Sequence, residues 1–256
     1  MATWLAKRAL ENQPALEIAN AFRDCGNPRL PRSFAHRLSY LHDSAEALRT
    51  AGAWLGFAGP LSDLRDLTRP GSDIPVDLLK YLAPVAPNAA LDLIERFVDA
   101  STPYELRASE CWFCKPLRTL LRKLAWFPEH FHRSTVLLSR IVQADLPGLS
   151  GNHSTSDLEG LFWARLSGTW ANTQQRLGLI EALLSAPDHP SQESGMIALR
   201  GMLKIGPFSS GHDFTFGGRA FRHAPGNGRA ASPELMVRLA GRYPGTAAPV
   251  DSTFLR

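Results

Sequence analysis

The sequence predicts an all-α protein, built as a HEAT/armadillo-like α-solenoid or as an irregular helical array, with a poorly ordered C-terminal tail. Three observations predict this fold class. Apolar residues recur at three- and four-residue steps through most of the chain. Two stretches, 78–98 and 120–142, share one pattern of residues. No alternation of apolar and polar residues of the strand type stands out before residue 212.

The clearest elements are two predicted helices in the stretch 117–146, joined by a tight corner at Pro128. Pro128 lacks an N–H and suits the first turn of the second helix. The apolar residues on one face of each helix are Leu117, Leu120, Leu121, Leu124 and Phe127 in the first, and Phe131, Val136, Leu137, Leu138, Ile141 and Val142 in the second. Since an antiparallel pair leaves both stripes half covered, we expect further helix pairs beside it.

The preceding part of the chain also has the pattern of helices. They are predicted at 2–25, 34–56, 61–67, 75–83 and 88–99. Pro14 is a weak point in the first helix, and Ser33 is the predicted N-cap of the second. Leu16 is among the residues of the first helix that are available to the core, and Leu48 is among the apolar residues of the second.

After residue 146 the pattern is weaker. A loop rich in Gly, Ser and Asn is predicted at 147–157. Three helices follow at 157–167, 174–185 and 191–205.

The domain organisation follows from a change in composition near residue 205. Residues 1–205 form the predicted helical-repeat domain, with a sub-boundary near 69–74. Residues 206–256 are a Gly- and Arg-rich link and a loose tail, because they offer too little apolar surface to offset the entropy of ordering.

Internal similarity favours stacking of successive pairs. Leu82 corresponds to Leu124 and Arg96 to Arg140, spacings of 42 and 44 residues. A period of about 40–47 residues with two helices each is typical of HEAT and armadillo repeats. A weaker third copy is predicted at 180–205.

Composition sets the broad class. The 256 residues are 44% hydrophobic and 20% charged, with a formal net charge of +4. No apolar run reaches the roughly 18 residues of a membrane span, and the N-terminal stretch reads as an amphipathic helix, not as a signal peptide. Three cysteines, an odd number, argue against a disulfide framework, so a cytoplasmic location is predicted.

Cys111 and Cys114 form a CxxC at a predicted helix start, a pattern that suits a redox pair because the helix dipole favours the thiolate. The favoured interpretation is that both are core residues, since free cysteine is among the most buried residue types. A zinc site with His130 and His132 is disfavoured, because two residues one apart on a helix point about 200° from each other.

No motif of a catalytic or nucleotide-binding site is present. The sequence contains neither a G-x-S-x-G elbow nor a G-x-x-x-x-G-K-[ST] phosphate loop. We therefore predict that the chain is not an enzyme, and we assign no catalytic, cofactor-binding or metal-binding residue.

Two stretches, RKLAWFPEHFHRSTVLLSRIVQAD and 158–186, resemble the helical-repeat regions of bacterial STAND-class P-loop ATPases, some of them antiphage defence proteins. The segment GPFSSGHDFTFGGR, 206–219, is similar to the link that follows such repeats. The resemblance covers roughly 75–220 and implies a sensor or scaffold role. Because the ATPase domain is lacking, it also implies a fragment, a split partner or an independent repeat protein, and it transfers no catalytic residue.

The leading hypothesis is therefore a non-enzymatic helical-repeat module that binds another protein. The predicted contact residues are Glu129, His130, Arg133, Asn152 and His153. Two alternatives remain open: a thiol redox or zinc-binding protein using Cys111 and Cys114, and a HEAT-like nucleic-acid binder using the basic C-terminal part. Nucleic acid is the less favoured partner, because no nucleic-acid-reading motif accompanies the charge.

Overall fold

The computed structural model describes residues 15–24, 26–27, 29–67, 75–107, 114–145, 153–163, 168–204, 215–217 and 219–220. In these residues the regular secondary structure is helical apart from one pair of two-residue strands, so the prediction of a helical protein is confirmed. The α-helices are α2 (Ala15–Asp24), α3 (Arg29–Leu38), α4 (Ala45–Leu55), α5 (Leu64–Leu67), α6 (Pro75–Leu82), α7 (Pro87–Ala100), α8 (Cys114–Leu124), α9 (Pro128–Asp145), α10 (His153–Glu159), α11 (Thr173–Leu184) and α12 (His189–Leu203). A 3₁₀ turn, η1 (Ser39–Leu41), follows α3.

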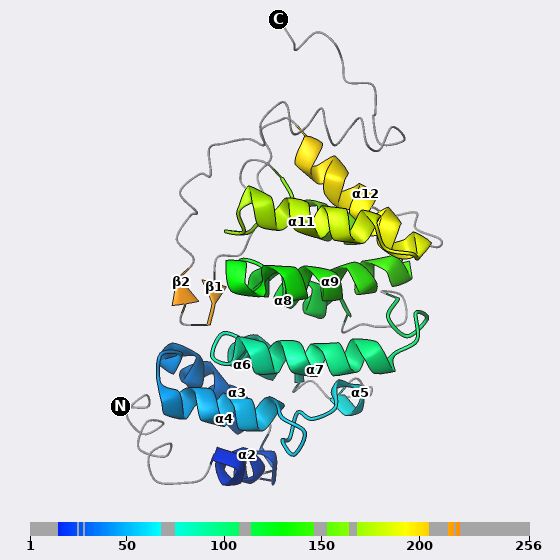
Figure 1. Cartoon of the computed structure of the whole chain (residues 1–256). Coiled ribbons are helices and arrows are strands. Elements are labelled where there is room, and N and C mark those ends of the chain that lie inside the picture. Colours follow the sequence, from blue (N-terminus) through cyan, green and yellow to red (C-terminus); the bar gives the residue numbers. More distant parts are fainter. Residues whose placement is uncertain are drawn as a thin grey trace, which may run out of the picture.

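The helices lie in two rows that follow the chain (Figure 1). In one row α2 contacts α4, α4 contacts α7, α7 contacts α9, and α9 contacts both α11 and α12. In the other row α3 contacts α6, α6 contacts α8, and α8 contacts α10. Contacts within the pairs α6–α7 and α8–α9 join the rows, so each helix packs on neighbours that are close in the sequence.

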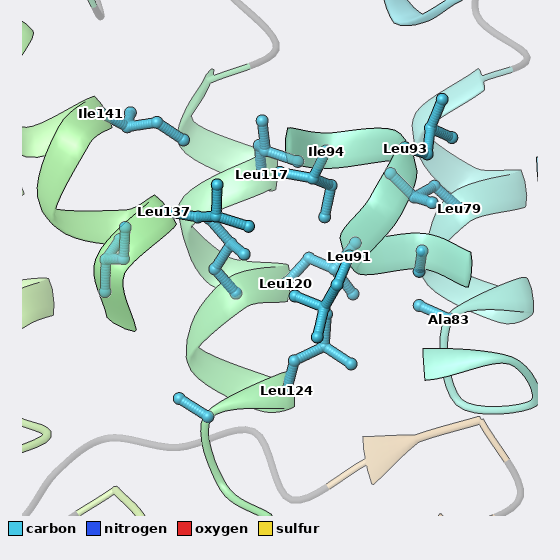
Figure 2. Close-up of a cluster of buried hydrophobic side chains, with 14 of the residues drawn as sticks. Leu79, Ala83, Leu91, Leu93, Ile94, Leu117, Leu120, Leu124, Leu137 and Ile141 are labelled. Carbon is cyan, nitrogen blue, oxygen red and sulfur yellow. The ribbon is translucent and has the colours of Figure 1, made fainter. Parts of the chain in front are cut away.

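The core lies between these rows. Figure 2 shows side chains of α6 and α7 meeting side chains of α8 and α9. The labelled residues are Leu79, Ala83, Leu91, Leu93, Ile94, Leu117, Leu120, Leu124, Leu137 and Ile141, all of them buried. Complete burial of one leucine side chain stabilises a fold by about 1.5–3 kcal/mol. One continuous apolar cluster therefore holds the pairs together.

The predicted pair within 117–146 is present as α8 and α9. Pro128 is the first residue of α9, as predicted. The two predicted stripes are buried except for Phe127 and Val136, which are partly buried against the core. Predicted helices 75–83, 88–99, 174–185 and 191–205 also match α6, α7, α11 and α12 to within two residues.

The prediction of one helix over 34–56 is wrong, because the chain breaks between α3 and α4. The Ser39 hydroxyl donates to the His36 carbonyl oxygen at 2.6 Å. The Ser44 side chain then accepts from the Ala47 N–H at 3.4 Å and caps α4. Serine hydroxyls that bond locally to the backbone compete with a continuing helix.

The start of α3 was also predicted too late, at Ser33. The helix begins at Arg29, where the Asn27 side chain accepts from the Arg29 N–H at 3.0 Å. Pro31 is the third residue of α3 and is buried. Proline is tolerated in the first turn because the N–H it lacks has no helical partner there.

The helix predicted at 157–167 lies earlier, as α10 (His153–Glu159). The chain turns directly afterwards, with the Gly160 N–H donating to the Ser156 carbonyl oxygen at 3.1 Å. The residues of α10 are mostly polar, and for this reason the sequence predicted a loop at 147–157. Its position comes from tertiary contacts of Asp157 and from complete burial of Leu158.

The described part of the link and tail contains the two strands. β1 (Thr215–Phe216) pairs antiparallel with β2 (Arg219–Ala220), with Thr215 opposite Ala220. Gly217, in the turn, has φ of 60°, a conformation that only glycine adopts freely. Strands this short leave no periodic pattern, so the sequence did not predict them.

Three further predictions lie outside the described residues. These are the start of the helix at 2–25 with its weak point at Pro14, the sub-boundary near 69–74, and the loose tail beyond residue 220.

Candidate protein-contact surface

Three of the five predicted contact residues lie at the start of α9. Glu129 is exposed, in the first turn of the helix. His130 is half-buried, with its ring edge-on to that of Phe127 at a centroid distance of 6.3 Å. Arg133, one turn later, is half-buried and bonds to α7.

The structure does not place the other two predicted residues beside these three. Asn152 lies outside the described residues, and His153 begins α10. The Asp157 carboxylate of α10 bonds to Arg118, which also bonds to Asp145 at the last residue of α9. Since Asp145 is roughly 24 Å along the helix from Glu129, the predicted set divides between the two ends of α9.

Arg133 and Arg140 connect α9 to α7. The Arg133 Nη2 lies 2.6 Å from the Asp92 Oδ1, and the same guanidinium bonds to the Glu95 carboxylate. Burial alone would lower the pKa of Arg133, but the hydrogen bonds and charges of Glu95 and Asp92 raise that pKa above its ordinary value. The Arg140 Nη1 lies 2.6 Å from the Asp99 Oδ1. Arg133 therefore remains charged and bound at neutral pH.

Arg96 of α7 corresponds to Arg140 of α9 in the predicted repeat, and both side chains bond to the preceding helix of their row. Its Nη2 donates to the Leu55 carbonyl oxygen at the end of α4, at 2.9 Å. Arg96 and Leu55 are 41 residues apart, and Arg140 and Asp99 are also 41 apart. Each arginine thus reaches back to the end of the preceding helix in its row.

The N-terminal helices expose large apolar and aromatic side chains. Among the described residues, those with the greatest exposure of this kind are Leu16, Leu30, Tyr40, Leu48, Phe57, Tyr104 and Trp170. The first five belong to α2, α3, η1, α4 and the turn after α4. The exposed fraction reaches 81% for Phe57, whose ring lies under the Arg96 guanidinium at 4.2 Å.

The prediction that Leu16 is available to the core is wrong, and Leu48 of the second predicted helix is exposed as well. Leu16 is 38% and Leu48 50% exposed. In α4 the buried face carries Ala47, Ala51 and Trp54 instead. Because alanine is small, the apolar spacing of 34–56 does not reveal this buried face.

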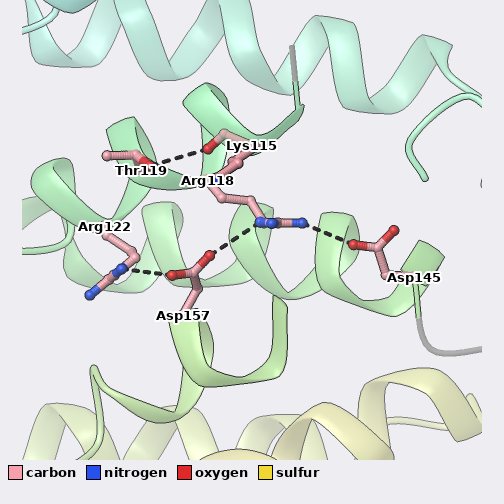
Figure 3. A network of polar contacts seen from close by, with 6 residues as sticks. All are labelled: Lys115, Arg118, Thr119, Arg122, Asp145 and Asp157. Atoms are coloured by element: carbon pink, nitrogen blue, oxygen red, sulfur yellow. Dashed lines mark hydrogen bonds and ion pairs between the residues drawn. The ribbon is translucent and has the colours of Figure 1, made fainter. Parts of the chain in front are cut away.

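Buried charges form a second polar group, at α8, α9 and α10 (Figure 3). The Arg118 Nη1 lies 2.9 Å from the Asp145 Oδ2, and the Arg118 Nε lies 3.2 Å from the Asp157 Oδ2. The Arg122 Nη1 bonds to the other Asp157 oxygen at 2.6 Å. Two guanidinium groups thus neutralise two carboxylates across three helices.

The sequence prediction missed these four residues. The sequence feature that could have indicated them is the pair Arg118 and Arg122, one turn apart on a helix whose other residues are mostly apolar. Their acidic partners lie 27 to 39 residues away along the chain, so no local pattern connects them.

Cys114 is completely buried and is disulfide-bonded. The odd cysteine count was therefore misleading, because it excludes full pairing but not a single bond. Cys111 and Cys25 lie outside the described residues. In the described part of the chain no three His, Cys, Asp or Glu side chains are grouped closely enough to hold a metal ion.

Comparison with known proteins adds no relative. No family model matches the sequence, and no curated protein or solved structure matches it either.

Within the described residues, no helix combines the length and apolar character needed to cross a membrane.

Proposed function

We propose that the chain is a non-enzymatic, HEAT-like helical-repeat module of the cytoplasm that binds another protein through its N-terminal helices. The observation that carries this proposal is the exposure of Leu16, Leu30 and Leu48 on three successive helices at one end of the rows. Stacked helical arrays require a polar outer face on their terminal units to stay soluble. A contiguous patch of exposed apolar side chains is typical of a contact surface, and we infer that these three leucines form such a patch.

The regular backward reach of Arg96 and Arg140 supports the repeat interpretation. Successive pairs of a solenoid are related by one repeated shift, so equivalent side chains make equivalent contacts. Such an array presents a long face to a partner. The resemblance to STAND-class repeat regions adds the expectation that the partner belongs to a bacterial signalling or antiphage defence system.

The test is capture of partners by the purified full-length protein, followed by mass spectrometry. Leu30→Glu and Leu48→Glu place charges on the proposed surface. Tyr104→Glu is the matched control, because Tyr104 is 58% exposed in the turn after α7. We expect a partner that is retained by the wild type and the control and lost from both leucine variants.

Two results would count against the proposal. Equal recovery of the same partner by all four proteins would place the contact elsewhere. Loss of the partner from Tyr104→Glu alone would move the contact to the turn after α7. Recovery of a P-loop ATPase that depends on Leu30 and Leu48 would support the sensor role in particular.

The alternative of a thiol redox protein is favoured by one observation, the disulfide of Cys114. Complete burial of Cys114 opposes it, because thiol–disulfide exchange requires access to the sulfur. Thiol titration of the native protein with and without dithiothreitol decides. Rapid appearance of two thiols under native conditions would favour the redox function, and slow appearance would favour a structural bond.

The alternative of a nucleic-acid binder has less support from the described arginines. Arg133 and Arg140 bond to carboxylates, and Arg96 bonds to a carbonyl oxygen. Binding to phosphates weakens steeply with salt. A mobility-shift titration at two salt concentrations would reveal such binding if the C-terminal part provides it.

A further inference from the structure

The turn between β1 and β2 lies against corners of three different helix pairs. The Phe216 ring is 1% exposed and packs against the Phe127 ring, in the corner between α8 and α9, at a centroid distance of 6.2 Å. Gly217 contacts Ser39, in η1 after α3, and Pro84, in the turn between α6 and α7. Figure 1 shows the two strands at one edge of the rows, beside these corners.

Gly217 fits this place closely. A Cβ atom at residue 217 would lie 2.8 Å from the Ser39 Cβ and 2.9 Å from the Pro84 Cγ. Separations below 3.0 Å require a neighbour to shift, and Pro84 and Ser39 are both buried. The absence of a side chain therefore allows the turn to approach both corners at once.

The three corners are far apart in the sequence. Ser39 lies between α3 and α4, Pro84 between α6 and α7, and Phe127 between α8 and α9. Each corner has its own backbone hydrogen bonds, including the Ser44 N–H to Leu41 O, the Val85 N–H to Leu82 O and the Phe127 N–H to Leu124 O. The turn 216–217 contacts all three corners, although it follows the last helix of the rows.

We propose that the β1–β2 hairpin is a clasp, a conformational device that fixes the α3–α4, α6–α7 and α8–α9 corners against one another. The aromatic ring of Phe216 fills the space beside Phe127, while Gly217 packs against Ser39 and Pro84. With the hairpin seated, the pairs are held at one edge. When the hairpin detaches from the three corners, the helices beside them can shift relative to one another along their apolar contacts.

The test is hydrogen–deuterium exchange of the full-length protein, followed by mass spectrometry of the three corners. Gly217→Ala adds a Cβ that collides with Ser39 and Pro84. Gly26→Ala is the matched control, since Gly26 also has positive φ, of 64°, but has nothing within 4 Å of an added Cβ. Overpacking strain of the usual size predicts exchange about tenfold faster at all three corners in Gly217→Ala, and unchanged exchange there in Gly26→Ala.

The amide of Ser185, which donates to Glu181 O at the end of α11, reports on the far end of the rows. We expect its exchange to be unchanged when the clasp opens. If Gly217→Ala accelerates Ser185 as much as the corners, the protein is unfolding as a whole. The milder Phe216→Leu then decides, because it keeps most of the apolar contact and loses only the aromatic packing.

Faster exchange at the three corners together, with Ser185 unchanged, supports the clasp in either variant. Faster exchange confined to 215–220, or to one corner, overturns it. A double-mutant cycle gives an independent measure: Ser39→Gly removes the atom nearest to the added Cβ, so it should reduce the effect of Gly217→Ala. Strictly additive effects of the two substitutions would also overturn the clasp.

Discussion

Arginine joins helices in two different ways in this molecule. At α8, α9 and α10, the side chains of Arg118 and Asp145 are each 5% exposed. Between α7 and α9, the side chains of Arg140 and Asp99 are 40% and 57% exposed. Both pairs are at hydrogen-bond distance, and they differ mainly in their contact with water.

Loss of contact with water decides which of these ion pairs determines the arrangement of the helices. A charged side chain that is removed from water is stable only when an opposite charge in the fold bonds to it. The buried group of Arg118, Arg122, Asp145 and Asp157 therefore favours one arrangement of α8, α9 and α10. An exposed pair exchanges protein contacts for water at little cost. The buried group should therefore determine how α10 docks, while the exposed pairs adjust a packing that apolar side chains have already fixed.

Removal of Arg118 should have the largest effect. Arg118→Ala leaves the Asp145 carboxylate buried without its guanidinium, which predicts a loss of about 3–5 kcal/mol in the free energy of unfolding. Urea denaturation at pH 7 measures it. Lys115→Ala, one turn earlier on the exposed side of α8, is the control and should change little. A loss below about 1 kcal/mol for Arg118→Ala would show that water reaches the group.

Removal of both charges should restore most of that loss. In Arg118→Met with Asp145→Leu, no buried charge loses its partner, since Asp157 keeps Arg122 at 2.6 Å. Apolar replacement of a buried pair is often neutral or stabilising. The same urea titration compares this double variant with Arg118→Ala. A double variant as unstable as Arg118→Ala would mean that lost side-chain packing, and not the unpaired charge, causes the effect.

Removal of Arg140 should have a small effect. Arg140→Ala breaks one exposed pair, so about 0.2–1 kcal/mol is expected. Salt screens exposed charges, and the difference between variant and wild type should shrink when the urea titration is repeated at high salt. A loss that is large and independent of salt would remove the contrast between the exposed and buried groups.

The smallest effect concerns a charge that caps a helix. The Asp188 side chain accepts from the Ser191 N–H at 2.8 Å at the start of α12. Hydrogen bonds from the Ser191 backbone and side chain lower the pKa of Asp188 below its ordinary value of 3.8. A lowered pKa means that the unfolded chain binds the proton more readily. The contribution is therefore present above pH 3.8 and is lost as pH falls through the lowered pKa.

Asp188→Asn tests this dependence, because asparagine caps a helix without titrating. Urea midpoints measured from pH 7 down to strongly acidic conditions should fall more for the wild type than for the variant. Parallel curves would show that protonation of Asp188 does not couple to folding.

The sequence predicted those parts of the fold that local pattern controls. Pro128 and the three- and four-residue spacing in α9 identify a helix and its buried face without reference to the rest of the chain. The same is true of the α6–α7 pair, whose shared corner is marked by Pro84 and Pro87. Glu129 is exposed in the first turn after such a corner, and its role in a contact stays a prediction.

The rest depends on contacts between distant residues. The break at Ser39–Ser44 arises from two serine hydroxyls that bond locally, in a stretch whose apolar spacing continues across it. The position of α10 depends on Arg118 and Arg122. The N-terminal exposed surface was missed because two of the residues on the buried face of α4, Ala47 and Ala51, are small, while Leu48 is exposed. Local spacing contains none of this information.

The seat of Phe216 and Gly217 also has a consequence for synthesis of the chain. Ser39 leaves the ribosome long before Gly217, so the first helix pairs must form while their shared edge is still uncovered. Contacts between residues so far apart form late, because closing a long loop costs entropy before the contact repays it. A nascent chain halted before residue 215 would therefore carry assembled helices with an open apolar edge, a surface that chaperones recognise.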